Sequence, residues 1–91
     1  MLESRTYLIV GRVQGVGFRW FTYEAARREG LTGVVSNRPD GTVEVSVEGD
    51  RAALDRFDGA IRRGPAGARV DAVDLEIGPA SRQYSDFNIK G

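Results

Sequence analysis

Residues 31–48, LTGVVSNRPDGTVEVSVE, predict a β-hairpin at the middle of the chain. Leu31 to Asn37 forms its first strand, and residues 38–41, RPDG, place proline and glycine where a reverse turn needs them. Thr42 to Glu48 forms its second strand, because apolar and polar residues alternate strictly along it. The residues expected to face inward are Val43, Val45 and Val47, and those expected to face outward are Thr42, Glu44, Ser46 and Glu48. What lies on each side of this hairpin decides the fold.

A strand and then a helix precede the hairpin, and a helix and then a strand follow it. The predicted elements are a strand over Arg5–Val13, a helix over Phe18–Glu29, a helix over Arg51–Arg63, a strand over Val70–Ile77 and a short last strand over Tyr84–Ile89. Both helices repeat their apolar residues at helical spacing, so each has one apolar face. Gly30 is placed to end the first helix and Asp50 to cap the second. The order of elements is therefore β-α-β-β-α-β with one extra strand.

This order predicts an α+β fold, the ferredoxin-like sandwich, with a mainly antiparallel sheet and two helices on one of its faces. A chain of 91 residues is expected to form a single domain, residues 1–91, since it is too short for two independent cores. Right-handed crossovers place the first strand beside the third and parallel to the second. We therefore expect the loop after the first strand and the hairpin turn at the same end of the sheet, with Arg19 and Asn37 on one side of the molecule.

Composition excludes several classes of chemistry. Lys and Arg number 13, as do Asp and Glu, so the chain lacks the excess positive charge that attracts proteins to nucleic acids or anionic membranes. It contains neither Cys nor His, which excludes disulfides, thiolate nucleophiles, Ser-His triads and imidazole metal ligands. A metal site would have to be built from oxygen ligands alone. No apolar run is long enough to span a membrane and the N-terminal segment is unlike a signal peptide, so we expect a cytoplasmic protein.

Residues 11–19, GRVQGVGFR, form a glycine-rich loop that leads from the first strand into the first helix. Glycines allow successive backbone N–H groups to converge on one point, and the N-terminus of a helix attracts anions. Arg19 is electrostatically misplaced at the positive end of the helix dipole unless an anion binds beside it. The spacing matches neither the Walker pattern nor the dinucleotide-binding pattern. The residues alone leave two interpretations open, an oxyanion site and a loop whose glycines serve only tight turning.

Several nearby residues also have both a functional and a structural interpretation. Asn37 opens a Pro-Asp-Gly turn, where asparagine is common because it caps local N–H groups. Trp20 and Tyr23 either stack on a ligand or, as their helical spacing favours, serve as partial core or surface-anchoring aromatics. The charged residues interpreted as solvated surface rather than as parts of a site are Arg12, Glu24, Glu29, Arg38, Glu44 and Glu48. Thr42 lies beside Asn37 in the hairpin, and we expect it to support that side chain with a hydrogen bond.

Two segments, GRVQGVGFR at 11–19 and TGVVSNRPDGTVEV at 32–45, closely resemble the signature segments of the acylphosphatase family. GPAGARVDAV at 64–73 is also similar to the family, and the resemblance covers essentially the whole chain. It implies the ferredoxin-like fold reached above. It further implies a small monomeric hydrolase, without metal or other cofactor, that splits the carboxyl–phosphate anhydride of acyl phosphates into carboxylate and inorganic phosphate.

The resemblance also implies roles for individual residues. Arg19 binds the substrate phosphate, and Asn37 holds the attacking water. The loop that contacts the phosphate, through its backbone and the Arg19 side chain, consists of Gln14, Gly15, Val16, Gly17, Phe18 and Arg19. Free phosphate or sulfate is expected to bind there as an anion ligand. The sequence departs from the family at Val34, where many relatives carry tryptophan. We expect this departure to change packing and substrate access near the site without loss of Arg19 or Asn37.

Two other functions share this fold. The chain is also similar to the acylphosphatase-like, anion-binding domains of larger carbamoyl-phosphate-using maturation proteins, and an assay for turnover separates an enzyme from such a module. A small RNA-binding domain would need exposed aromatic residues and a basic sheet face. Residues 42–48, TVEVSVE, offer neither, so no nucleic-acid partner is expected.

Overall fold

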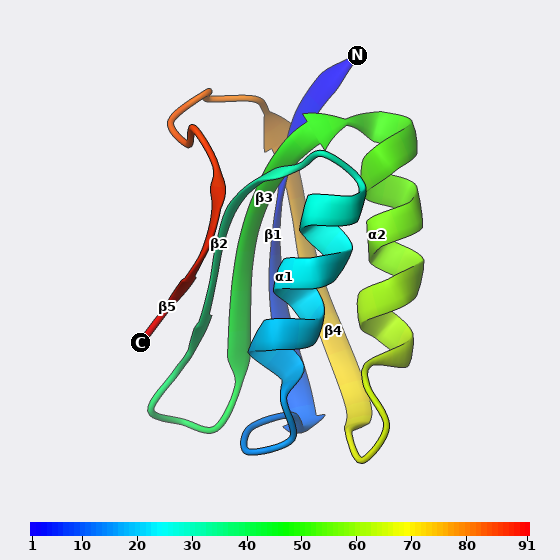
Figure 1. The fold of residues 1–91 in the computed structure, drawn as a ribbon, viewed down its shortest axis with the longest axis vertical. Helices are drawn as coiled ribbons and strands as arrows, with labels where there is room; N and C mark the ends of the chain where they lie inside the picture. Colours follow the sequence, from blue (N-terminus) through cyan, green and yellow to red (C-terminus); the bar gives the residue numbers. More distant parts are fainter.

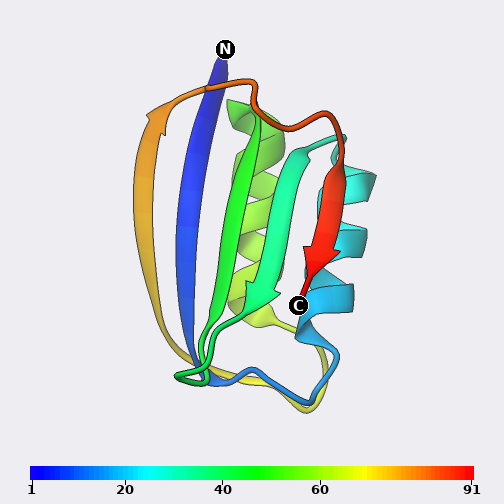
Figure 2. The ribbon, with the colours of Figure 1, turned by 90° about the vertical axis from the view of Figure 1, so that its left-hand side faces the viewer.

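The computed structural model describes residues 1–91 as two layers, a five-stranded sheet and two helices packed on one of its faces (Figure 1). The elements are β1 (Leu2–Arg12), α1 (Phe18–Arg28), β2 (Thr32–Asn37), β3 (Val43–Asp50), α2 (Arg51–Arg63), β4 (Arg69–Pro79) and β5 (Phe87–Lys90). The strands lie in the order β4-β1-β3-β2-β5, with the helices behind them in Figure 2. This arrangement confirms the predicted α+β ferredoxin-like sandwich.

Strand direction brings the loop after β1 and the β2–β3 hairpin to one end of the sheet. β1 pairs antiparallel with β3, and β3 pairs antiparallel with β2, so β1 and β2 run in the same direction. Both strands end at the lower edge of Figures 1 and 2, where the loop at 13–17 and the turn at 38–42 lie. We refer to this end of the strands as the loop end of the sheet, and to the end where β1 begins as the opposite end.

The bounds of β1, β4 and β5 differ most from prediction. β1 and β4 are both longer than predicted because they pair with each other from Glu3 and Pro79 onward. β5 begins at Phe87 rather than Tyr84, because it pairs in parallel with residues 33–36 of β2 only. These pairings join segments that are far apart in the chain, and local sequence patterns do not report them.

Both helices begin and end close to where the sequence predicts. Asp50 caps α2, and its carboxylate accepts a hydrogen bond from the backbone N–H of Ala52 at 3.1 Å. Gly30 follows α1 with a φ of 71°, the left-handed conformation expected just past a helix end. α1 starts differently, because Gly17 precedes it and no side chain caps its first turn. Neither helix is both long enough and apolar enough to cross a membrane.

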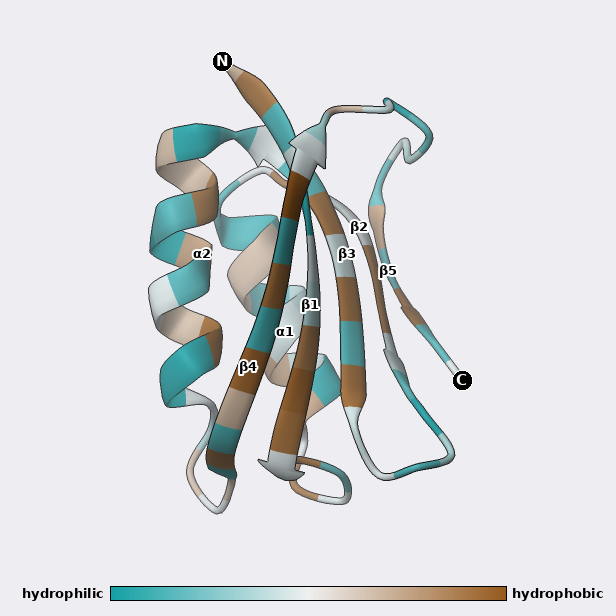
Figure 3. Ribbon diagram, turned by 180° about the vertical axis from the view of Figure 1, so that it is seen from behind, coloured by the Kyte–Doolittle hydropathy of each residue, from teal (hydrophilic) through white to brown (hydrophobic).

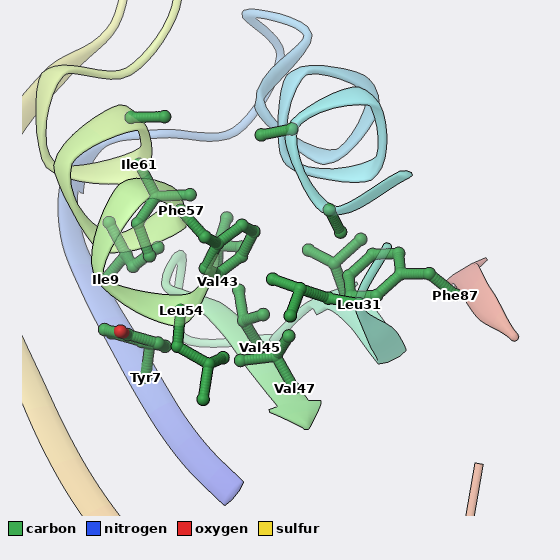
Figure 4. Packing of buried hydrophobic residues seen from close by; sticks show 14 of the residues in the cluster. Tyr7, Ile9, Leu31, Val43, Val45, Val47, Leu54, Phe57, Ile61 and Phe87 are labelled. Carbon is green, nitrogen blue, oxygen red and sulfur yellow. The ribbon is translucent and has the colours of Figure 1, made fainter. Parts of the chain in front are cut away.

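The core lies between the sheet and the helices (Figure 4). Three valines of β3 form its centre and are fully or almost fully buried, which confirms the predicted inner face of that strand. These valines and the residues around them on β1 and α2 include Val43, Val45, Val47, Tyr7, Ile9, Leu54, Phe57 and Ile61. Full burial of one such side chain stabilises the fold by about 1.5–3 kcal/mol. The core therefore fixes the sheet and both helices, and with them the loops at each end.

The other face of the sheet carries no helix (Figure 3). Glu48 lies on this face, as predicted, but it is only 6% exposed, so its interpretation as solvated surface is wrong. The β4–β5 connection covers it, and its carboxylate accepts hydrogen bonds from the backbone N–H groups of Ser81 and Arg82 and from the Ser81 hydroxyl. Burial acts to raise the pKa of Glu48, but these hydrogen bonds outweigh burial and hold the pKa below its usual value. Glu29 is also less solvated than predicted, since it is half-buried in an ion pair.

Candidate active site

The loop between β1 and α1 contains two glycines in the left-handed conformation. Gly15 has a φ of 75° and Gly17 a φ of 78°. A Cβ atom at either position would meet nothing within 4 Å, so the backbone angle, not crowding, requires glycine there. Left-handed residues of this kind allow successive N–H groups to face one point. The first turn of α1 has neither a capping side chain nor an acidic residue, so its N–H groups remain available to an anion.

Arg19 lies in that first turn and has no partner within the protein. Seven of the twelve arginines form an ion pair with a carboxylate. Of the five that do not, Arg12, Arg28, Arg63 and Arg82 are exposed and only Arg19 is half-buried. A partly desolvated cation at the positive end of a helix dipole is unfavourable without a counter-ion. The arrangement therefore favours a bound anion beside Arg19.

Asn37 lies at the end of β2 and also has an unpaired polar atom. Its side-chain oxygen, Oδ1, is buried and forms no hydrogen bond within the protein. Leaving such an acceptor unsatisfied costs about 1–3 kcal/mol, so buried polar atoms nearly always have a partner. A water or ligand donor is the partner that this position lacks. The first strand-loop-helix unit and the hairpin thus each bring one unsatisfied polar group to the loop end of the sheet.

Arg19 and Asn37 line the same pocket, which confirms that they lie on one side of the molecule. The pocket has a volume of about 260 Å³, just below the 300–1,000 Å³ typical for drug-sized ligands. Its lining residues are Val13, Gly15, Gly17, Phe18, Arg19, Trp20, Asn37 and Ile89. They include no carboxylate, so Arg19 is the only charged group. This pocket can bind a small oxyanion and orient a water, and it contains no side chain suited to be a general base.

Gln14 has a role that the sequence did not suggest. Its side-chain amide nitrogen donates hydrogen bonds to the backbone oxygens of Arg38 at 2.8 Å and Thr42 at 3.0 Å. These bonds tie the glycine loop to the hairpin turn, and so fix the two halves of the pocket relative to each other. Gln14 and Val16 do not line the pocket, in contrast to the other residues predicted for the loop.

Thr42 does not support Asn37, so that expectation is wrong. The Thr42 hydroxyl donates instead to the Asp40 carboxylate at 2.6 Å, and a hydroxyl has only one proton to give. Arg38 pairs with Glu44 at 3.4 Å and stays outside the pocket, as the interpretation of solvated surface predicts.

Two residues near the site differ from what the sequence alone suggested. Val34 is half-buried and is not one of the lining residues, so nothing in the pocket supports an effect on substrate access. Ile89 lines the pocket although no sequence signal indicated it, because β5 reaches this end only by pairing with β2.

A larger pocket of about 360 Å³ lies at the opposite end of the sheet, lined by residues that include Glu48 and Arg82. The Glu48 carboxylate there already accepts three hydrogen bonds and Arg82 is exposed to solvent, so this pocket contains no buried polar side-chain atom without a partner. Nowhere in the protein do three His, Cys, Asp or Glu side chains gather as a metal site would require. Arg19 and the unpartnered Asn37 Oδ1 thus make the pocket at the loop end the candidate active site.

Comparison with known proteins shows what the whole chain is similar to. The model of the family described as Acylphosphatase matches residues 5–89. An acylphosphatase of Koribacter versatilis (strain Ellin345) is 46% identical over 89 residues, which are 98% of this chain and 81% of that protein. The crystal structure of acylphosphatase from Bacillus subtilis has a TM-score of 0.93 at 36% identity, with 100% of both chains covered. The crystal structure of full-length HypF in the phosphate- and nucleotide-bound form has a TM-score of 0.91 at 30% identity. The match covers 100% of this chain and 12% of the HypF chain.

Proposed function

The chain belongs to the acylphosphatase family and is a hydrolase that acts on acyl phosphates, and from that premise we propose how its pocket performs the reaction. We propose a metal-independent hydrolysis that converts an acyl phosphate and water into a carboxylate and inorganic phosphate. One observation carries this proposal: the Arg19 guanidinium and the Asn37 Oδ1, neither of which has a partner in the protein, line the same pocket.

Arg19 and the backbone of residues 14–18 bind the phosphate group in this proposal. The guanidinium offers a planar fork of donors that suits two phosphate oxygens at once, and the backbone N–H groups complete the binding. Phosphoryl transfer needs little covalent assistance, because most of the catalysis comes from stabilising charge and aligning the nucleophile. A cation and preorganised N–H donors supply the first of these requirements.

Asn37 aligns the nucleophile by accepting a hydrogen bond from the attacking water. The water oxygen bonds to phosphorus while the bond from phosphorus to the acyl oxygen breaks, and the carboxylate leaves with the electron pair. Asparagine cannot accept a proton at neutral pH, so one water proton passes to an oxygen of the phosphate itself. The leaving carboxylate is a weak base and needs no general acid, which fits a pocket without His, Cys, Asp or Glu.

Free phosphate and sulfate, in this proposal, bind the same loop as competitive ligands. We also propose that the protein acts as a cytoplasmic monomer.

Benzoyl phosphate with a chelator present tests the reaction. We expect turnover in the wild type, and a loss of kcat/KM of at least about 100-fold in Arg19→Ala and in Asn37→Ala. Arg19→Lys is expected to lose most activity as well, because a point charge cannot replace a fork. Arg28→Ala is the matched control, since it removes an exposed, unpaired arginine from the same helix. Phosphate binding without any turnover would instead favour an anion-binding module, and loss of turnover on chelation would overturn metal independence.

A further inference from the structure

We propose that Trp20 and Ile89 form the binding surface for the acyl part of the substrate, and that they favour acyl phosphates with aromatic or extended apolar acyl groups. This inference rests on the proposed function. It concerns the half of the pocket that phosphate binding leaves unused. An acyl phosphate has a charged end and an acyl end, and the pocket correspondingly has a polar part and an apolar part.

The polar and apolar groups of the pocket come from different residues. Gly15, Gly17, Arg19 and Asn37 provide the polar groups, and four residues provide the apolar surface, namely Val13, Phe18, Trp20 and Ile89. Val13 and Phe18 are each only 1% exposed, so they have almost no surface left for a ligand. Trp20 is 57% exposed and Ile89 is 40% exposed. Only these two side chains can bury further apolar surface when a substrate binds.

The positions of the two side chains fit this role. Trp20 directly follows Arg19 in the first turn of α1. Ile89 pairs with Val35, two residues before Asn37 on the neighbouring strand. Val13 and Phe18 are buried, so Trp20 and Ile89 are the apolar lining residues that an acyl group extending from the loop toward solvent can contact.

Trp20 is held rigidly enough to act as a binding surface. Its ring stacks on Tyr23, one turn further along α1, at 5.2 Å between centroids and an interplanar angle of 21°. Tyr23 is itself fixed, because its hydroxyl accepts a hydrogen bond from Arg27 at 3.1 Å and its ring lies 6.4 Å from that of Phe87. A rigid aromatic side chain binds apolar groups at low cost in conformational entropy. Trp20 also keeps more than half of its surface free, so a second ring can pack on it.

Binding of this kind changes KM more than kcat. The acyl group contacts Trp20 similarly in the ground state and the transition state, so the interaction is uniform. An aromatic contact on tryptophan is expected to change affinity by about 10-fold. A small acyl group such as acetyl reaches little of this surface and should gain little from it.

The test compares benzoyl phosphate with acetyl phosphate as substrates. For Trp20→Ala we expect the KM for benzoyl phosphate to rise about 10-fold with kcat nearly unchanged, and both constants for acetyl phosphate to stay within about twofold. Ile89→Ala should show a smaller rise of the same kind, and Trp20→Phe should keep most of the preference. Ile77→Ala is the matched control, because Ile77 is 61% exposed on β4 and lies outside the pocket. Ile77→Ala should change neither KM nor kcat for either substrate.

A binding measurement gives a second readout without turnover. Trp20 is the only tryptophan, so its fluorescence reports changes in the surroundings of this one side chain. We expect phenylphosphonate to change the fluorescence more strongly than inorganic phosphate does, and to bind Trp20→Phe more tightly than Trp20→Ala when measured by calorimetry.

The outcomes separate this inference from the proposed function. Hydrolysis of both substrates with an unchanged KM ratio in Trp20→Ala overturns the acyl-binding surface and leaves the proposed function standing. An equal loss of kcat for both substrates also overturns it, since Trp20 would then act only by positioning Arg19. If the wild type hydrolyses neither substrate, the proposed function fails. Phenylphosphonate binding that is equal in wild type and Trp20→Ala then overturns the binding surface as well.

Discussion

At the opposite end of the sheet the Arg5 guanidinium bonds to Glu3 at 2.8 Å, to Asp55 at 2.7 Å and to the Tyr7 hydroxyl at 3.4 Å. At the loop end the Arg19 guanidinium bonds to no side chain, and its neighbour Asn37 has a buried oxygen without a partner. Both arginines are withdrawn from solvent, Arg5 fully and Arg19 by half. The difference is therefore one of partners, not of residue type.

The polar groups of the opposite end form a closed network between β1 and α2. The Tyr7 hydroxyl donates to Asp58 at 2.9 Å, and Asp58 in turn accepts from Arg62 at 2.7 Å. Burial raises the pKa of Tyr7 to about 12, so the hydroxyl keeps its proton at neutral pH. Burial acts to lower the pKa of Arg5, but its hydrogen bonds outweigh burial and raise the pKa. Complete pairing fits a structural role, whereas an unpartnered cation and an unpartnered amide oxygen in one pocket fit a ligand site.

Replacement of each arginine by methionine tests this contrast most strongly. Arg5→Met leaves the buried Glu3 carboxylate with only the exposed Arg51 as its cation, and should lower the free energy of unfolding by about 3 kcal/mol. Arg19→Met removes a cation that has no partner and should change it by less than about 1 kcal/mol. Urea denaturation followed by circular dichroism measures both. Equal destabilisation by the two substitutions would contradict the contrast, and failure of Arg5→Met alone to fold would agree with it.

Glu48→Gln tests the other fully hydrogen-bonded charged group at the opposite end. Its effect on the free energy of unfolding depends on pH. At neutral pH we expect a loss of about 1–3 kcal/mol, because the neutral amide binds Ser81 and Arg82 more weakly than a carboxylate does. The pKa of Glu48 lies below its usual 4.5 in the folded state, so its contribution is complete above about pH 4.5 and is lost as the pH falls through the folded value. The gap in stability between wild type and variant should therefore narrow in acid. A constant gap from pH 7 to pH 3 would show that the charge of Glu48 does not matter.

Gln14→Leu separates assembly of the loop end from stability. Both carbonyl groups that Gln14 contacts keep a second hydrogen bond, since Arg38 O also accepts from Gly41 and Thr42 O from Arg38. Stability should therefore fall by only about 1 kcal/mol. Activity should fall about 10-fold, because the loop and the hairpin lose their fixed spacing. Gln83→Leu, which alters an exposed glutamine at the opposite end, is the control and should leave kcat/KM unchanged.

Gly59→Ala is expected to have the smallest effect, and in the stabilising direction. Gly59 lies within α2 between the two ends, its φ is negative, and a Cβ atom there meets only the Arg63 side chain at 3.6 Å. Alanine should add about 0.5–1 kcal/mol to the free energy of unfolding. The same substitution at Gly17 forces a side chain into the left-handed region and should instead remove about 1–2 kcal/mol. Thermal unfolding of both variants, side by side, checks that the loop glycine is needed for its backbone angle.

Local patterns in the sequence predicted most of the fold. Alternation along residues 42–48, the turn at 38–41, the apolar face of each helix and the Asp50 cap all depend on residues close together in the chain. They gave the order of elements, and chain connectivity then placed the glycine loop and Asn37 at one end. The electrostatic misplacement of Arg19 was visible in the same way, since a helix dipole acts within one turn.

The sequence by itself thus predicted the elements, their order and the placement of Arg19 and Asn37 at one end of the sheet. Only the tertiary structure decided which polar groups are satisfied. It paired Thr42 with Asp40, buried Glu48 under the β4–β5 connection, used Gln14 to join loop and hairpin, and brought Ile89 into the pocket. Each of these contacts depends on segments that meet by packing or by the chain's path through a turn. The free energy of a buried polar group is set by the atoms around it, and no short stretch of sequence specifies those atoms.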